Sequence, residues 1–292
     1  MAMICKLHFS QNISSSTVLS SKTRINTHAV LVIGTHLSSS DENVVEMNKI
    51  GDFLSARGVK VHKFYIQNSR WEDIKRAAKN AHFFVYSGHG SNQGKNGTGG
   101  LVLADYVTND QIEHELELGN NAMVLFQSVC RAAGSSAGDR GDIGVKLAEQ
   151  RVSDYAEPFI KNGASVYYAN NYHEGCLEFL NYFFIGNTIE ESYKKSLASR
   201  LNIEFIKNYS YNPKYNVSIS SSQPYGTATY THTSWVNGVK TTTTEEVPDS
   251  KSYSTAFVGK SNLCCVSISL YSTDSYFFPA LFNCVFTFTC VK

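Results

Sequence analysis

Two side chains of this 292-residue sequence have the chemistry of a nucleophile and its proton-transfer partner. His89 stands between Gly88 and Gly90, shortly after a strand-like run that ends at Tyr86. Cys130 follows another apolar run, and beyond Arg131 it precedes only small residues as far as position 138. A thiol is mostly protonated at neutral pH, and a nearby imidazole stabilises the reactive thiolate. The pair therefore predicts acyl transfer, if the fold brings the two positions together.

The glycine after the histidine suits the same chemistry. Gly90 has no side chain, so the backbone can approach a substrate carbonyl there, and its N–H could donate to a developing oxyanion. The N–H of Cys130 is the second candidate donor. Each residue alone has an ordinary explanation, because a lone cysteine is usually a small core residue and a lone histidine a structural or surface group. The prediction therefore depends on their joint occurrence.

The elements that must position these residues alternate between strand and helix. Short apolar or alternating runs predict strands at 29–34, 59–65, 81–86, 122–126 and 165–169. Amphipathic spacing predicts helices at 41–54, 70–80, 108–118, 142–161 and 188–201. Thr108 and Gln111 form a capping-box pattern, and Pro158 is expected to kink or split its helix.

Repeated strand–helix units predict an α/β fold, a three-layer sandwich with a mostly parallel sheet between helices. Ligands bind at the carboxyl ends of the strands in such sheets. His89 and Cys130 each follow a predicted strand, so they would emerge at the same edge if those strands are neighbours.

The character of the chain changes after residue 204, where Ser, Thr, Tyr and Asn dominate. Alternation on both sides of Asn237-Gly238 predicts a β-hairpin. The chain is accordingly divided into a disordered lead-in (1–27), a catalytic domain (28–204), a small β-rich C-terminal extension (205–262) and a tail without assigned structure (263–292).

The Tyr-Ser-Gly-His-Gly segment at 86–90 and the Val-Cys pair at 129–130 resemble the two signatures of caspase-like cysteine peptidases. This superfamily includes caspases, metacaspases, gingipains, clostripain and separase-type domains. The resemblance covers roughly residues 28–200. It implies a caspase-like fold with His89 as general base or thiolate partner, Cys130 as nucleophile, and the Gly90 and Cys130 amides as the oxyanion hole. The implied activity is that of a cysteine-type endopeptidase that cleaves peptides or proteins through an acyl-thioester.

The substrate preference of these families does not carry over. Caspases have Gln two positions before the cysteine and metacaspases have Asp there, whereas this chain has Ser128. Ser128, Asp139 and Asn170 are the candidates for substrate binding. Asp139 could approach a basic side chain, but we expect it and Asp142 to cap the following helix, because acidic groups stabilise helix N-termini. Asn170 could equally be a turn residue.

Composition limits the partners and cofactors. A net charge of +1 gives no long-range field for nucleic acid or an anionic membrane, and no uncharged apolar stretch of about 18 residues predicts a membrane span. None of the seven cysteines has CxxC spacing, so we expect no metal site. Without a clear export signal, we expect reduced thiols and a cytoplasmic protein. Calcium activation has no signal in the sequence, and the oligomeric state stays open.

Two rival functions belong to other classes. A binding or signalling module on the same fold, with little turnover, is suggested by the uncharged Ser128. A nucleotide-binding doubly wound domain is the weaker rival, because no G-x-G-x-x-G follows the first predicted strand and no phosphate-binding loop occurs elsewhere.

Overall fold

The computed structural model describes residues 27–35, 40–92, 94, 96–139, 141–172, 174–197, 201–222, 227–236, 239–248, 251–269 and 284–290. Its centre is an eight-stranded sheet in the order β2-β1-β3-β6-β7-β12-β9-β8. Five strands run parallel, namely β1 (His28–Ile33), β2 (Lys60–Tyr65), β3 (Ala81–Ser87), β6 (Leu118–Gln127) and β7 (Val166–Asn170). Three antiparallel additions follow, β12 (Ser252–Gly259), β9 (Asn216–Ser222) and β8 (Asn202–Asn208). The fold is therefore α/β with a mixed sheet.

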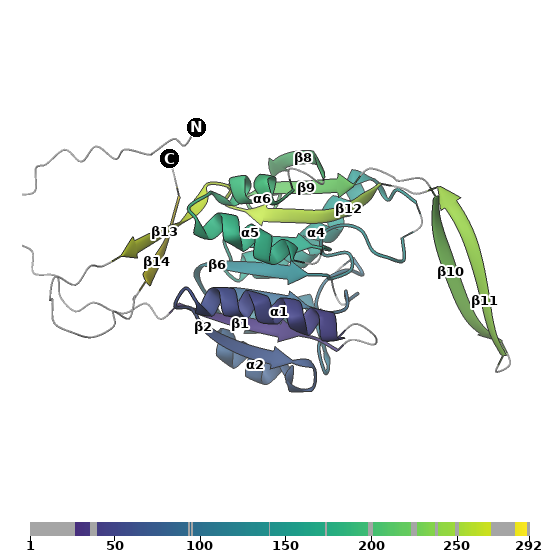
Figure 1. The fold of residues 1–292 in the computed structure, drawn as a ribbon, viewed down its shortest axis with the longest axis horizontal. Coiled ribbons are helices and arrows are strands. Elements are labelled where there is room, and N and C mark those ends of the chain that lie inside the picture. The colour runs from purple at the N-terminus through teal and green to yellow at the C-terminus, as the bar shows by residue number, and fades with distance from the viewer. Residues whose placement is uncertain are drawn as a thin grey trace, which may run out of the picture.

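Helices cover both faces of this sheet (Figure 1). One face packs against α1 (Ser40–Ser55), α5 (Gly175–Phe184) and α6 (Ile189–Leu197), and the other against α2 (Trp71–Ala78), α3 (Asn109–Glu115) and α4 (Gly144–Lys161). Alternate residues of β1 enter different cores, since Val30 packs with the α2 and α4 side and Leu31 with the α1 and α5 side. In the described ranges, no helix has the length and apolar character needed to cross a bilayer.

A local signal accounts for the start of α3, whereas another, at Pro158, does not end its helix. Thr108 caps α3 in the predicted capping box, because its hydroxyl accepts the Gln111 N–H while the Gln111 side chain accepts the Thr108 N–H. Pro158 does not split α4, which continues as one helix to Lys161. Proline lacks the N–H that would bond to the carbonyl of Asp154, and the Asn109 side chain donates to that carbonyl instead, at 2.8 Å. The expected break is therefore compensated.

Several strands of the predicted β-rich extension belong to the main sheet. β8, β9 and β12 continue the main sheet, so the predicted boundary at residue 204 falls inside β8. Within the described part of this extension, β10 (Thr227–Val236) and β11 (Val239–Pro248) lie outside the main sheet, as the expected antiparallel hairpin, which projects from the body in Figure 1.

Some elements were not predicted. Helix α5 and the antiparallel pair β13 (Leu263–Ser269) and β14 (Cys284–Cys290) had no assignment. The apolar run at 101–103, by contrast, suggests a short strand or hairpin, and β4 (Leu101–Val102) does pair with β5 (Tyr106–Val107). A short 3-10 helix, η1, spans Ile66–Asn68. The predicted lead-in lies outside the described residues except for Thr27.

Candidate active site

The carboxyl ends of three neighbouring parallel strands form one edge of the sheet. Ser87 of β3 pairs with Gln127 of β6, and Gln127 pairs with Asn170 of β7. His89 and Cys130 follow the first two of these strands, and both are exposed. The condition set by the sequence, that the two strands be adjacent, is therefore met.

The two segments touch through their backbones. A methyl carbon placed on Gly90 would lie 2.2 Å from the carbonyl oxygen of Cys130 and 3.0 Å from its Cβ. Both distances are far shorter than a van der Waals contact, so only glycine fits at position 90 without moving the cysteine. The residue beside His89 thus packs directly on the thiol-bearing residue.

The hydroxyl of Tyr155, on α4, lies within hydrogen-bond distance of both segments. Its hydroxyl accepts the Ser91 N–H at 2.7 Å, and it lies 3.3 Å from the Ser91 carbonyl and 3.4 Å from the Cys130 carbonyl. The single hydroxyl proton can serve either carbonyl. Burial raises the pKa of Tyr155 above its ordinary value, so the hydroxyl stays protonated. In the sequence this tyrosine was only an apolar helix position, and nothing there indicated its link to the site.

A second tyrosine supports the histidine turn. The Tyr86 hydroxyl accepts the Val102 N–H at 3.0 Å and lies 3.2 Å from the His89 carbonyl. A Cβ on Gly88 would come within 2.3 Å of this hydroxyl. The glycine before the histidine is therefore required by packing against Tyr86.

The loop that carries Cys130 is fixed at both ends. Ser128 has a positive φ of 55° and its N–H donates to the Asn170 carbonyl at 2.8 Å. Further on, Ser135 exchanges two hydrogen bonds with Tyr253 of β12, at 2.9 and 2.8 Å. A non-glycine residue with positive φ is held there by its surroundings. Cys130 therefore lies on a loop that hydrogen bonds hold in place on both sides of it.

Two backbone donors are available beside the thiol. Among the described residues, the N–H groups of Gly90 and Cys130 donate to no other protein atom. Both belong to the segments that meet at the Gly90–Cys130 contact. Unpaired amides next to a nucleophile can stabilise the negative oxygen of a tetrahedral intermediate.

The substrate-binding candidates are placed differently from one another. Asp139 accepts two hydrogen bonds from Arg151 of α4, at 2.6 and 2.8 Å, and one from the Ser136 N–H. The side chains of this ion pair are 14% and 12% exposed, so Asp139 fixes the loop to α4. The expectation that Asp139 caps the helix is wrong, because its carboxylate accepts hydrogen bonds from the Arg151 side chain and the Ser136 N–H and from no N–H of the first turn of α4. Asp142 does accept the N–H of Gly144 at the helix start, at 2.8 Å.

Asn170 is buried, with 1% of its surface exposed. Its amide oxygen accepts the Tyr172 N–H at 2.5 Å, so the side chain of this last β7 residue bonds to the turn that follows the strand. Neighbouring Gln127, also buried, donates to the Tyr172 carbonyl and accepts the Cys176 N–H at 3.1 Å, and so anchors the start of α5. Ser128 is partly exposed, whereas Asn170 is buried and Asp139 is held in an ion pair.

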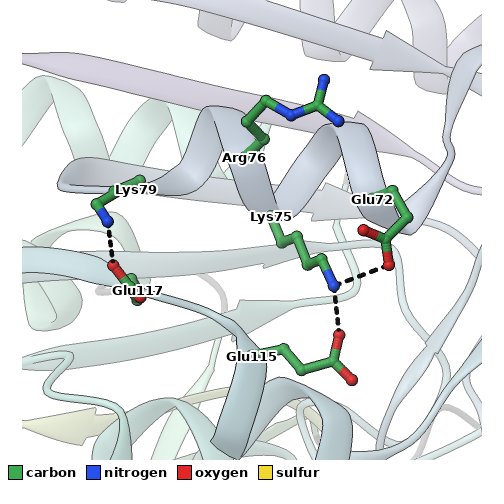
Figure 2. A pocket seen from close by; sticks show the side chains of 6 residues that line it. All are labelled: Glu72, Lys75, Arg76, Lys79, Glu115 and Glu117. Carbon is green, nitrogen blue, oxygen red and sulfur yellow. Dashed lines mark hydrogen bonds and ion pairs between the residues drawn. The ribbon is translucent and has the colours of Figure 1, made fainter.

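Two surface hollows lie away from these residues. One, of about 230 Å³, lies along α2 and is lined by charged side chains from positions 72–79 and 115–117 (Figure 2). Its ion pairs are Lys75 with Glu72 and Glu115, and Lys79 with Glu117, at 2.8 to 3.0 Å. The other, of about 460 Å³, lies between α3 and α4. Mutually paired charges of this kind are typical of a solvated surface.

The described ranges contain no cluster of three or more His, Cys, Asp or Glu side chains suited to a metal ion. No protein-family model matches the chain, and no curated protein is significantly similar to it.

Proposed function

We propose that this chain is a cysteine-type endopeptidase of the caspase-like kind, with Cys130 as nucleophile and His89 as its proton-transfer partner. The observation that carries the proposal is the close backbone contact between Gly90 and Cys130 at two adjacent strand ends. The parallel strands between two helical layers are consistent with the fold that the sequence motifs imply.

The proposed reaction has two stages. The Cys130 thiolate attacks the peptide carbonyl carbon, and the Gly90 and Cys130 amides stabilise the resulting oxyanion. His89 gives a proton to the leaving amine as the C–N bond breaks, which leaves an acyl-thioester on Cys130. In the second stage His89 takes a proton from water, the hydroxide adds to the thioester, and the acid product leaves as the thiol is restored.

The substrate preference is not set by Asp139 in this proposal. Its carboxylate is occupied by Arg151 in a mostly buried ion pair, and breaking that pair to bind a basic side chain would leave an arginine uncompensated. Ser128 is uncharged and partly exposed beside the thiol, so it remains the candidate for contact with the substrate.

The test is labelling with an electrophilic peptide probe. We expect covalent labelling of the wild-type chain and none of Cys130→Ala. Cys176→Ala is the matched control, because this thiol is buried at the start of α5 and should not react. Labelling that survives Cys130→Ala would end the proposal.

A peptide-library screen separates the peptidase from the binding module. We expect cleavage under reducing conditions, with or without calcium. Labelling of Cys130 without cleavage of any library peptide would favour the module with little turnover.

A further inference from the structure

The hairpin β10–β11 is inserted at the edge of the sheet that carries the candidate site. It connects β9 to β12, which are neighbours with Ser222 opposite Ser252. Because β12 is antiparallel to both β7 and β9, the end of β9 lies at the same edge as Asn170, the end of β7. The hairpin therefore leaves the body on the side of His89 and Cys130, and Figure 1 shows it projecting outward.

The hairpin is exposed along its length. In the described residues it forms a sheet of only two strands, and the side chains that are described, at 231, 233–235 and 239–246, are all exposed. Trp235 and Val239 near the turn are 69% and 64% exposed. A lone two-stranded hairpin is marginally stable in water, and its outer edges offer unpaired N–H and C=O groups to another strand.

Strand β11 carries a positive side chain near one end and negative side chains near the other. Lys240 lies near the turn, Glu245 and Glu246 lie near the base, and only threonines occupy 241–244. Edge charges normally discourage strand pairing. Here an antiparallel copy of the same strand would bring the lysine of one chain to the acidic end of the other.

Symmetry selects one register for such a pair. Opposed residues of an antiparallel pair lie on the same face of the sheet, so a two-fold axis requires one residue to face itself. If Thr243 faces Thr243 of the second copy, Lys240 lies opposite Glu246 of that copy. Centring on Thr242 places it opposite Thr244, and centring on Thr244 places it opposite Pro248. Only the Thr243 register pairs the lysine with an acid.

We propose that two copies of this chain associate through β11, edge to edge and antiparallel, with Thr243 facing Thr243. The result is a four-stranded sheet in the order β10-β11-β11-β10 with two Lys240–Glu246 pairs across the interface. Strand β10 has no Asp, Glu, Lys or Arg, so its outer edge offers no comparable charge selection. The inference concerns assembly and does not depend on the proposed peptidase activity.

Intermolecular disulfide formation tests the register. Both variants are made in the full chain carrying Cys130→Ser, which removes the thiol that is exposed among the cysteines whose side chains are described. Opposed Cβ atoms are about 5 Å apart, so Thr243→Cys should form a disulfide-linked dimer on mild oxidation. In the matched variant Thr241→Cys, the two sulfurs would be about 14 Å apart, because they are offset by four residues, and no such dimer is expected. Equal cross-linking of both variants would overturn the register.

Charge reversal tests the interface without cysteines. We expect sedimentation equilibrium to show a reversible dimer, with association weakened about tenfold or more by Lys240→Glu or Glu246→Lys, since each change makes two like-charge pairs. The double variant Lys240→Glu/Glu246→Lys should restore dimerisation. A wild-type chain that stays monomeric at its highest soluble concentration, or single variants that associate as the wild type does, would overturn the proposal.

Discussion

At the scale of single residues, Gly90 has no room for a side chain beside Cys130. In Gly90→Ala the new methyl would lie 2.2 Å from the Cys130 carbonyl oxygen, so the cysteine must move. A displacement of about 1 Å in a reacting group can cost about 100-fold in rate, and we expect a loss of that size in probe labelling. Gly138→Ala in the following loop is the control, because its nearest neighbour would be 4.0 Å away. Labelling of Gly90→Ala at the wild-type rate would contradict the close approach.

The histidine should contribute to rate rather than to stability. His89 is exposed, so His89→Ala should affect the unfolding midpoint far less than peptide cleavage, which should fall about 10²–10⁴-fold, the usual contribution of a general acid or base. His114→Ala is the control: His114 is also exposed but lies on α3, so this variant should have no effect on cleavage. Equal cleavage by the two variants would argue against the role of His89.

Asp139 should act on stability and not on specificity. Asp139→Asn removes the charged partner of Arg151, so we expect about 1–3 kcal/mol less stability by chemical denaturation. The preference for the residue before the cleaved bond should stay the same in a peptide library. A lost preference for basic residues in this variant would return Asp139 to the substrate pocket.

At the scale of elements, α4 holds the two site segments together through one hydroxyl. Tyr155→Phe leaves the buried Ser91 N–H without this acceptor, which should cost about 1–3 kcal/mol. Tyr215→Phe is matched, since its buried hydroxyl bonds to the Ala164 carbonyl, away from Cys130. Both variants should be destabilised, but only Tyr155→Phe should also slow probe labelling. Equal labelling by both would mean that the Tyr155 bridge does not position the thiol.

Elements whose signals are local could be predicted from the sequence. The apolar runs of β1, β3, β6 and β7, and the capping box of α3, agree with the structure to within a few residues. The placement of β8, β9 and β12 in the main sheet could not, because it depends on pairing between strands that are far apart in the chain. A Ser- and Thr-rich strand with little apolar surface gives no indication of its neighbour.

The candidate site was predictable in the same limited sense. His89 and Cys130 were found because each follows an apolar run, and adjacent parallel strands then bring them to one edge. The Asp139–Arg151 pair joins a loop to a helix that begins several residues later, and Tyr155 bonds to residues on two other segments. Neither contact has a characteristic spacing in the sequence, so only the folded chain shows them.

For the whole molecule, two histidines of the main sheet, His82 on β3 and His62 on β2, predict how stability depends on pH. Burial lowers the pKa of His82, with a smaller effect from His28, and burial together with Lys60 and His28 lowers that of His62. Because these pKa values are lowered in the folded chain, the unfolded chain binds protons before the folded chain does as the pH falls. Stability should therefore be full above the unfolded value of about 6.5 and fall as the pH drops below it.

The check is thermal unfolding between about pH 7.5 and pH 5, a range above the usual titration of carboxylates. The loss of stability on acidification should be smaller in His82→Gln than in the wild type. His114→Gln, at an exposed position, is the control and should keep the wild-type slope. An unchanged slope in His82→Gln would exclude this histidine as a source of the pH dependence.

The most direct measurement is a crystal structure of the chain with a peptide aldehyde. The account predicts a hemithioacetal on the Cys130 sulfur, its oxygen about 2.7–3.1 Å from the Gly90 and Cys130 amide nitrogens, and the His89 ring within hydrogen-bond reach of the adduct. An aldehyde bound without a bond to that sulfur, or an adduct whose oxygen points away from both amides, would contradict it.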